Sequence, residues 1–325
     1  MSDNDIQDQL TKYLTDAHSI EEQALQQLRT APDIAGDPQL SKIFADHLVE
    51  TEDQERMVRQ RLEARDATPS KLKQAVMRAG GTAFVLFARS QPDTPGKLSA
   101  HAFSYEHLEL AGYELLLRVA ERAGDPETAE VARRIRDQEQ HMAERLETSF
   151  DRAVDASLQR VQPDNMGDQL VQYLTDAHAI ESQSIQLLQR GPKIAGQTQL
   201  ASLYSDHLAE TRRHQELVEQ RLQARGSSPS SLKDAAMRLG ALNWGVFFQA
   251  QPDTPGKLAA FAFAFEHLEI GGYEQLRRVA ERAGDQETVV AADRILSEER
   301  AAAGRIAGHW DQAVEASLQA QGVSP

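Results

Sequence analysis

The architecture of this chain follows from one run of residues, Phe103-Ser-Tyr-Glu-His-Leu-Glu-Leu-Ala-Gly-Tyr113. Glu106 and Glu109 stand three residues apart and Tyr113 follows four later, so all three share one face of a helix. That face is also the apolar one, since apolar residues recur on it every three or four positions: Leu98, Ala102, Tyr105, Leu108, Gly112, Leu116 and Ala120. Two carboxylates are therefore expected on or beside a buried stripe, where an unpaired charge is costly and a protonated, paired or metal-bound one is tolerated.

The same run returns 160 positions later as Phe263-Ala-Phe-Glu-His-Leu-Glu-Ile-Gly-Gly-Tyr273. Other segments match at the same offset without a gap: Tyr13 to His18 with Tyr173 to His178, Asp46 to Leu48 with Asp206 to Leu208, Gln91 to Leu98 with Gln251 to Leu258, and Val119 to Asp125 with Val279 to Asp285. This period is too long for a solenoid, whose repeats run from about 20 to 50 residues. We expect a duplicated domain, with copies at 1–162 and 163–325 and helix breakers Pro163 and Gly167 at the joint.

The composition of the chain excludes several kinds of site and partner. The chain has 325 residues, of which 40% are hydrophobic, so it can bury a sizeable core. It has no cysteine, which excludes disulfides, thiolate metal sites and cysteine nucleophiles. A net charge of -15 argues against nucleic acid and anionic membranes as partners and mildly favours cations. No signal sequence or membrane anchor is recognisable, so we expect a cytoplasmic protein.

The expected secondary structure is almost wholly helical. In the first copy we expect long helices at about 6–29, 39–65, 94–123 and 127–158, separated by proline and glycine signals, and we expect no strand. A shorter apolar segment, about 70–88, lies between the second and third helices. The predicted fold is all-α, with two tandem antiparallel four-helix bundles, each carrying that extra short helical segment.

Each long helix carries glutamate near its midpoint, on or beside its apolar stripe. Because the midpoints of antiparallel helices share one layer, these carboxylates are expected to converge on a shared cation or proton. The bland alternative is a solvated acidic face, since an error of one residue in the stripe rotates it by about 100°. The candidate metal ligands are Glu21, Glu50, Glu106, Glu109 and Glu139 in the first copy, and Glu181, Glu210, Glu266, Glu269 and Glu299 in the second.

Histidines accompany these acids on the second helix of each copy. The expected stripe there is Ile43, His47, Glu50, Gln54 and Met57. His47 lies one turn before Glu50, and His214 lies one turn after Glu210, so either is within reach of a metal held by that acid. His214 joins the candidate ligands, while the roles of His47 and His207 stay open. The copies are expected to differ here because His214 aligns with Gln54.

The chain resembles the YciE/YciF family of ferritin-like stress proteins over both copies. The matching pieces are Leu14-Thr-Asp-Ala-His-Ser-Ile-Glu21, His47-Leu-Val-Glu50-Thr-Glu, Glu106-His-Leu-Glu-Leu-Ala-Gly-Tyr113 and the acids around Glu139. The resemblance implies a ferritin-like bundle and a two-metal carboxylate centre similar to that of rubrerythrins. It also implies that Glu50 and Glu109 bridge the metals.

One departure from ferritin-like sites concerns the Glu-x-x-His pattern. In this chain no histidine stands three residues after Glu50, Glu139, Glu210 or Glu299. These positions hold Asp53, Met142, Arg213 and Ala302, respectively. A site with so few histidines is oxygen-rich, which favours iron, manganese or magnesium over zinc.

The leading hypothesis is a metal-binding stress-response protein with a di-metal site of iron or manganese in each copy. If the site turns over, the expected chemistry is ferrous-iron oxidation or peroxide reduction, and whether the chain is an enzyme stays open. The alternative is a non-catalytic helical scaffold without metal, whose acids are protonated, hydrogen-bonded to His47 and tyrosine, or turned outward. The two copies are expected to pack on each other as a pseudo-dimer, and further homo-oligomerisation is left open.

Overall fold

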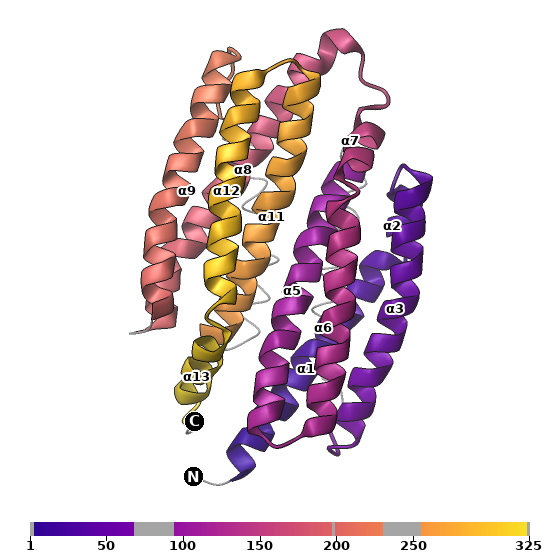
Figure 1. Cartoon of the computed structure of the whole chain (residues 1–325), viewed down its shortest axis with the longest axis vertical. Helices are drawn as coiled ribbons and strands as arrows, with labels where there is room; N and C mark the ends of the chain where they lie inside the picture. Colours follow the sequence, from indigo (N-terminus) through magenta and orange to yellow (C-terminus); the bar gives the residue numbers. More distant parts are fainter. Residues whose placement is uncertain (1–2, 68–93, 197–198, 230–254, 324–325) are drawn as a thin grey trace.

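The computed structural model describes residues 3–67, 94–196, 199–229 and 255–323 (Figure 1). Over these residues the regular structure is helical and contains no strand, which confirms the all-α prediction. The short segment expected at 70–88 and its counterpart in the second copy lie outside the described residues.

Each repeat is built around four long helices that lie side by side in Figure 1. In the first repeat these are α1 (Asp3–Leu28), α3 (Pro38–Glu63), α5 (Thr94–Arg122) and α6 (Pro126–Glu147), with the shorter α2 (Ala31–Ile34) and α7 (Phe150–Leu158). In the second they are α8 (Met166–Ala195), α9 (Gln199–Ala224), α11 (Pro255–Arg282) and α12 (Gln286–Ala307), with η1 (Pro163–Asn165) and α13 (Trp310–Ala320).

Aspartate caps begin several of these helices. Asp37 accepts hydrogen bonds from the amides of Gln39 and Leu40 at the start of α3, and Asp125 accepts one from Thr128 at the start of α6. Such caps satisfy backbone donors that have no partner within the helix. Gly124 supplies the left-handed backbone (φ 69°) that lets the chain turn tightly between α5 and α6.

Contacts between helix ends set the directions of the helices. Arg61 and Arg65, at the end of α3, both bind Asp125 at the start of α6. Arg65 also donates to the carbonyl of Gln7 at the start of α1. Neighbouring helices therefore run antiparallel, and their middles fall in one layer, as the sequence suggested.

The helix expected over 127–158 is in fact two helices, so that prediction was wrong. Thr148 and Ser149 lie between the two helices, and their hydroxyls donate to the carbonyls of Glu144 and Arg145. The second repeat breaks at the aligned pair Gly308 and His309.

The two repeats pack through α5 and α11, which lie side by side in Figure 1, with a pseudo-twofold relation. Lys97 lies 3.4 Å from Asp176, and the residues at the exchanged positions, Lys257 and Asp16, lie 2.6 Å apart. Such reciprocal pairs are typical of a symmetric dimer interface.

Histidine rings stack where the pseudo-twofold axis crosses the interface. The ring centroids of His107 and His267 are 3.4 Å apart, and the ring planes differ by 11°. Nearby, the Ser104 hydroxyl donates to the Ala264 carbonyl at 2.7 Å. Helices α5 and α11 are thus buried around most of their circumference, which explains why each carries apolar residues beyond a single stripe.

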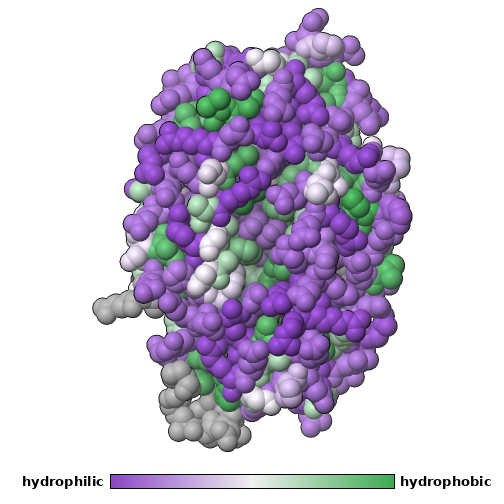
Figure 2. All heavy atoms as spheres, viewed as in Figure 1, coloured by the Kyte–Doolittle hydropathy of each residue, from purple (hydrophilic) through white to green (hydrophobic). Residues whose placement is uncertain are grey.

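The outer surface is polar. Figure 2 shows a mostly hydrophilic face in which apolar side chains are scattered in small patches. Among the described residues the exposed large hydrophobic side chains are Val49 and Val290. No helix in the described part of the chain has both the length and the apolar character needed to cross a bilayer.

Candidate metal centre

A buried group of four potential ligands lies at the middle of the first repeat. His47 on α3, Glu106 and Glu109 on α5, and Glu139 on α6 each offer an atom within 4.8 Å of the others. The Nε2 atom of His47 lies 3.1 Å from Glu106 Oε2 and 3.5 Å from Glu139 Oε2. All four side chains are almost completely buried. Three helices therefore aim one imidazole and three carboxylates at one point.

Four atoms of this group have no hydrogen-bond partner outside it: His47 Nε2, Glu106 Oε2, Glu109 Oε1 and Glu139 Oε2. Buried polar atoms in proteins are nearly always paired, because leaving one unpaired is costly. Here the unpartnered atoms belong to groups that converge on one point. This donor set fits a divalent cation, which would satisfy all four at once.

Glu21 approaches the group from α1, where the sequence placed it. It is fully buried, and it accepts a hydrogen bond from the hydroxyl of Tyr113. Its second oxygen, Oε2, has no partner. Glu21 is not among the four residues whose atoms converge, so it stands at the edge of the group.

Without a cation the group retains protons. Burial raises the pKa values of Glu109 and Glu139 well above their ordinary range and raises that of Glu21 to about 8. Burial by itself would lower the pKa of His47, but Glu106 and Glu139 raise it well above its ordinary value. Binding a cation here means displacing these protons.

Glu50 lies outside this group. The prediction that it lies on the buried stripe of α3 was wrong. The buried positions of α3 are Leu40, Phe44, His47, Thr51, Gln54, Val58 and Leu62, so the true stripe passes beside Glu50, whose side chain is 36% exposed. Its carboxylate Oε2 lies 2.9 Å from His47 Nδ1 and accepts a hydrogen bond from Arg145 at 2.6 Å. The hydrogen bond with His47 is the main reason why the pKa of Glu50 falls to about 2. Glu50 therefore holds the imidazole so that Nε2 faces the carboxylates.

The second repeat reproduces this arrangement. His207, Glu266, Glu269 and Glu299 form the corresponding buried group. His207 Nε2 lies 2.8 Å from Glu266 Oε2 and 3.4 Å from Glu299 Oε2. Glu210 matches Glu50, since it lies 3.1 Å from His207 Nδ1, accepts from Arg305 at 2.6 Å, and stays outside the group.

A further group of ligands, Glu181, His214 and Glu299, is found in the second repeat. His214 Nδ1 lies 2.7 Å from Glu299 Oε1 and 3.9 Å from Glu181 Oε1. In the first repeat Gln54 takes the place of His214 and donates to Glu139 Oε1. The structure thus brings His214 to the site, as the sequence suggested.

Sequence reasoning left the roles of His47 and His207 open. The signal for them was present, because both recur at the 160-residue offset and both fall on the apolar stripe. The sequence does not show how α3 is rotated about its axis. This rotation decides whether His47 or Glu50 faces the other ligands.

Another group, His18, Glu22 and Glu55, lies within 4.8 Å in the first repeat and is only partly buried. The second repeat has Ser182 and Gln215 at the positions of Glu22 and Glu55, so this group is not duplicated.

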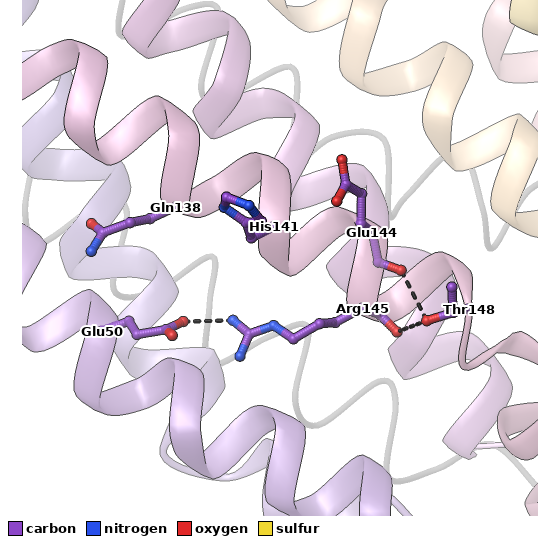
Figure 3. Close-up of a pocket in the computed structure, with 6 residues that line it drawn as sticks. All are labelled: Glu50, Gln138, His141, Glu144, Arg145 and Thr148. Atoms are coloured by element: carbon purple, nitrogen blue, oxygen red, sulfur yellow. Dashed lines mark hydrogen bonds and ion pairs between the residues drawn. The ribbon is translucent and has the colours of Figure 1, made fainter.

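An open pocket of about 480 Å³ lies on the outer side of Glu50. Its lining residues are Glu50, Gln138, His141, Glu144, Arg145 and Thr148. In Figure 3 the side chains of Glu50 and Arg145 point toward each other across it. Glu50 therefore separates this pocket from His47.

These features define an all-helical protein of two repeats, each enclosing a buried carboxylate and histidine group with the chemistry of a metal site. The chain belongs to the family described as a domain of unknown function, DUF892, whose model matches residues 5–159 and 165–319.

Proposed function

We propose that each repeat is a ferritin-like four-helix bundle that binds a divalent metal, iron or manganese, and that the chain serves as a cytoplasmic metal-binding stress protein of the YciE/YciF type. The repeats correspond to domains at 1–162 and 163–325. The observation that carries the proposal is the convergence of His47, Glu106, Glu109 and Glu139, whose facing atoms have no hydrogen-bond partners outside the group.

The helix arrangement supports the ferritin-like assignment. Helix α1 packs against α3 and α5, and α6 packs against the same two helices, so the four helices form a ring. Since α3 and α5 are each antiparallel to α1, they run in the same direction. A bundle with one long crossover of this kind is typical of ferritin-like folds, which bind metals between their helices.

The scaffold alternative explains part of the site but not its centre. The hydrogen bond from Tyr113 accounts for one oxygen of Glu21, and protonation accounts for carboxyl groups with raised pKa values. The 3.1 Å contact between His47 Nε2 and Glu106 Oε2 is also compatible with an ion pair, but it leaves Glu109 Oε1 without a hydrogen-bond partner. A cation contacted by the whole group satisfies these atoms together.

The donor set favours iron or manganese. Three carboxylates and one imidazole form an oxygen-rich set that still contains a nitrogen ligand. A bound iron or manganese ion would supply redox chemistry, and the expected substrates are ferrous iron or peroxide. The residues of the chain hold the ion, position His47 through Glu50, and shield the site within the bundle.

The test is the metal content of the full chain, purified without a tag or chelator, by elemental analysis. We expect at least one iron or manganese per repeat, and loss of that metal in the double variant His47→Gln/His207→Gln with helix content unchanged. The control is His141→Gln, which changes an exposed histidine on α6. Absence of metal, combined with no anaerobic uptake of Fe²⁺ or Mn²⁺, would favour the scaffold.

A further inference from the structure

We infer that the two repeats differ in the number of cations they hold: the second repeat binds a pair bridged by Glu299, and the first binds one. The whole chain then binds three. This inference rests on the proposed function, and it adds that any reaction requiring two adjacent cations is confined to the second repeat.

Glu299 carries the argument, because its two carboxylate oxygens face two different imidazoles. Oε2 lies 3.4 Å from His207 Nε2, and Oε1 lies 2.7 Å from His214 Nδ1. Glu299 is fully buried, and neither oxygen has a hydrogen-bond partner outside the ligand group. A carboxylate placed between two nitrogen ligands in this way is suited to bridging two cations.

The second cation position has its own ligands. His214 is 2% exposed, and the neighbours of its Nδ1 are the carboxylates of Glu299 and Glu181. Glu181 Oε2 has no hydrogen-bond partner. The other ring nitrogen, Nε2, lies 2.8 Å from Glu298 Oε2. A carboxylate that accepts a hydrogen bond from one ring nitrogen keeps the proton on that nitrogen and leaves the lone pair on the other free for a metal, as is usual for metal-binding histidines.

The first repeat lacks this position because two residues differ together. Gln54 stands at the place of His214, and Gln138 stands at the place of Glu298. The Gln54 amide donates to Glu139 Oε1, the oxygen that corresponds to Glu299 Oε1. A hydrogen bond thus occupies the oxygen that a second cation would need. An amide is also a weaker ligand than imidazole for iron or manganese.

The experiment is a Mn²⁺ titration of the full chain after chelator treatment, with bound Mn²⁺ counted by elemental analysis and its magnetic state read by electron paramagnetic resonance. We expect three ions per chain and two overlapping spectra, one from an isolated ion and one from an exchange-coupled pair. His214→Gln should bind two ions and lose the coupled spectrum, whereas His141→Gln should match the unmodified chain.

The converse variant, Gln54→His/Gln138→Glu, should bind four ions and strengthen the coupled spectrum. Because it adds a site rather than removing one, its outcome stands even if His214→Gln folds poorly. A count of two or four in the unmodified chain, or a coupled spectrum that survives His214→Gln, would overturn the asymmetry and leave the proposed function in place. No bound Mn²⁺ at all would overturn the proposed function itself.

Discussion

Replacing Glu109 and Glu269 by glutamine separates the role of these residues in metal binding from their role in folding. Burial raises the pKa of each carboxyl well above its ordinary value, so each carries a proton when no cation is present. Glutamine has nearly the same shape and is also neutral. We therefore expect Glu109→Gln/Glu269→Gln to leave the metal-free fold intact and to abolish the stabilisation by the cations that Glu109 and Glu269 contact.

The size of the effect follows from mass action. A ligand present at one hundred times its dissociation constant stabilises the folded state by about 2.7 kcal/mol per site. Unfolding entropy is about 2.1 cal/mol/K per residue, which for 325 residues gives about 0.7 kcal/mol/K. Each bound cation should therefore raise the melting temperature by about 4 °C. The substitution itself changes hydrogen bonds worth about 1 kcal/mol each, or about 1.5 °C.

The assay is differential scanning calorimetry of the full chain, once with EDTA and once with saturating Mn²⁺. The control is Glu52→Gln, which removes an exposed carboxylate of α3 and should keep the full metal shift. Two results would refute the reasoning: a metal shift in Glu109→Gln/Glu269→Gln as large as in the unmodified chain, or a fall of many degrees in its metal-free melting temperature.

Two further predictions concern pH and Glu50. The pKa values of Glu181 and Glu266 rise to about 8 and that of His214 to about 9, so cation binding must displace protons, and Mn²⁺ affinity should increase from pH 6 to pH 9. Because these folded-state values exceed the unfolded ones, the contribution of the two glutamates to metal-free stability is complete below about pH 4.5 and that of His214 below about pH 6.5, and these contributions are lost as the pH rises to between 8 and 9. The metal-dependent shift should grow over the same range. Melting curves with and without Mn²⁺ test this, and a shift that shrinks with pH contradicts it. Glu50→Gln/Glu210→Gln should weaken Mn²⁺ binding by about 10- to 100-fold, because Glu50 and Glu210 orient His47 and His207. The number of bound ions should not change. If the titration shows fewer bound ions, Glu50 and Glu210 are themselves metal ligands.

Much of this architecture was evident in the residues themselves. The 160-residue offset reveals the duplication, and the prolines, glycines and aspartates around Asp37, Gly124 and Asp125 locate helix ends, because capping and turn chemistry are local. Glu21, Glu109 and Glu139 were also placed inward correctly. Each lies on or beside a stripe of buried apolar residues.

Local chemistry did not reveal where the last long helix breaks. Helix propensity changes little across Thr148 and Ser149, so the pattern favoured one continuous helix. The break is stabilised by packing, since Phe150 on α7 is fully buried and Ser157 accepts a hydrogen bond from the Gly96 amide at 2.9 Å.

The rotation of α3 depended on tertiary structure in the same way. The apolar stripe of this helix is interrupted by polar residues, so the sequence analysis made Glu50 a candidate ligand and left the role of His47 open. Contacts from α5 and α6 decide between them by turning His47 toward Glu106 and Glu139 and leaving Glu50 to Arg145. Helix formation is a local property that sequence patterns capture, whereas the angle of a polar helix about its axis is set by the helices packed against it.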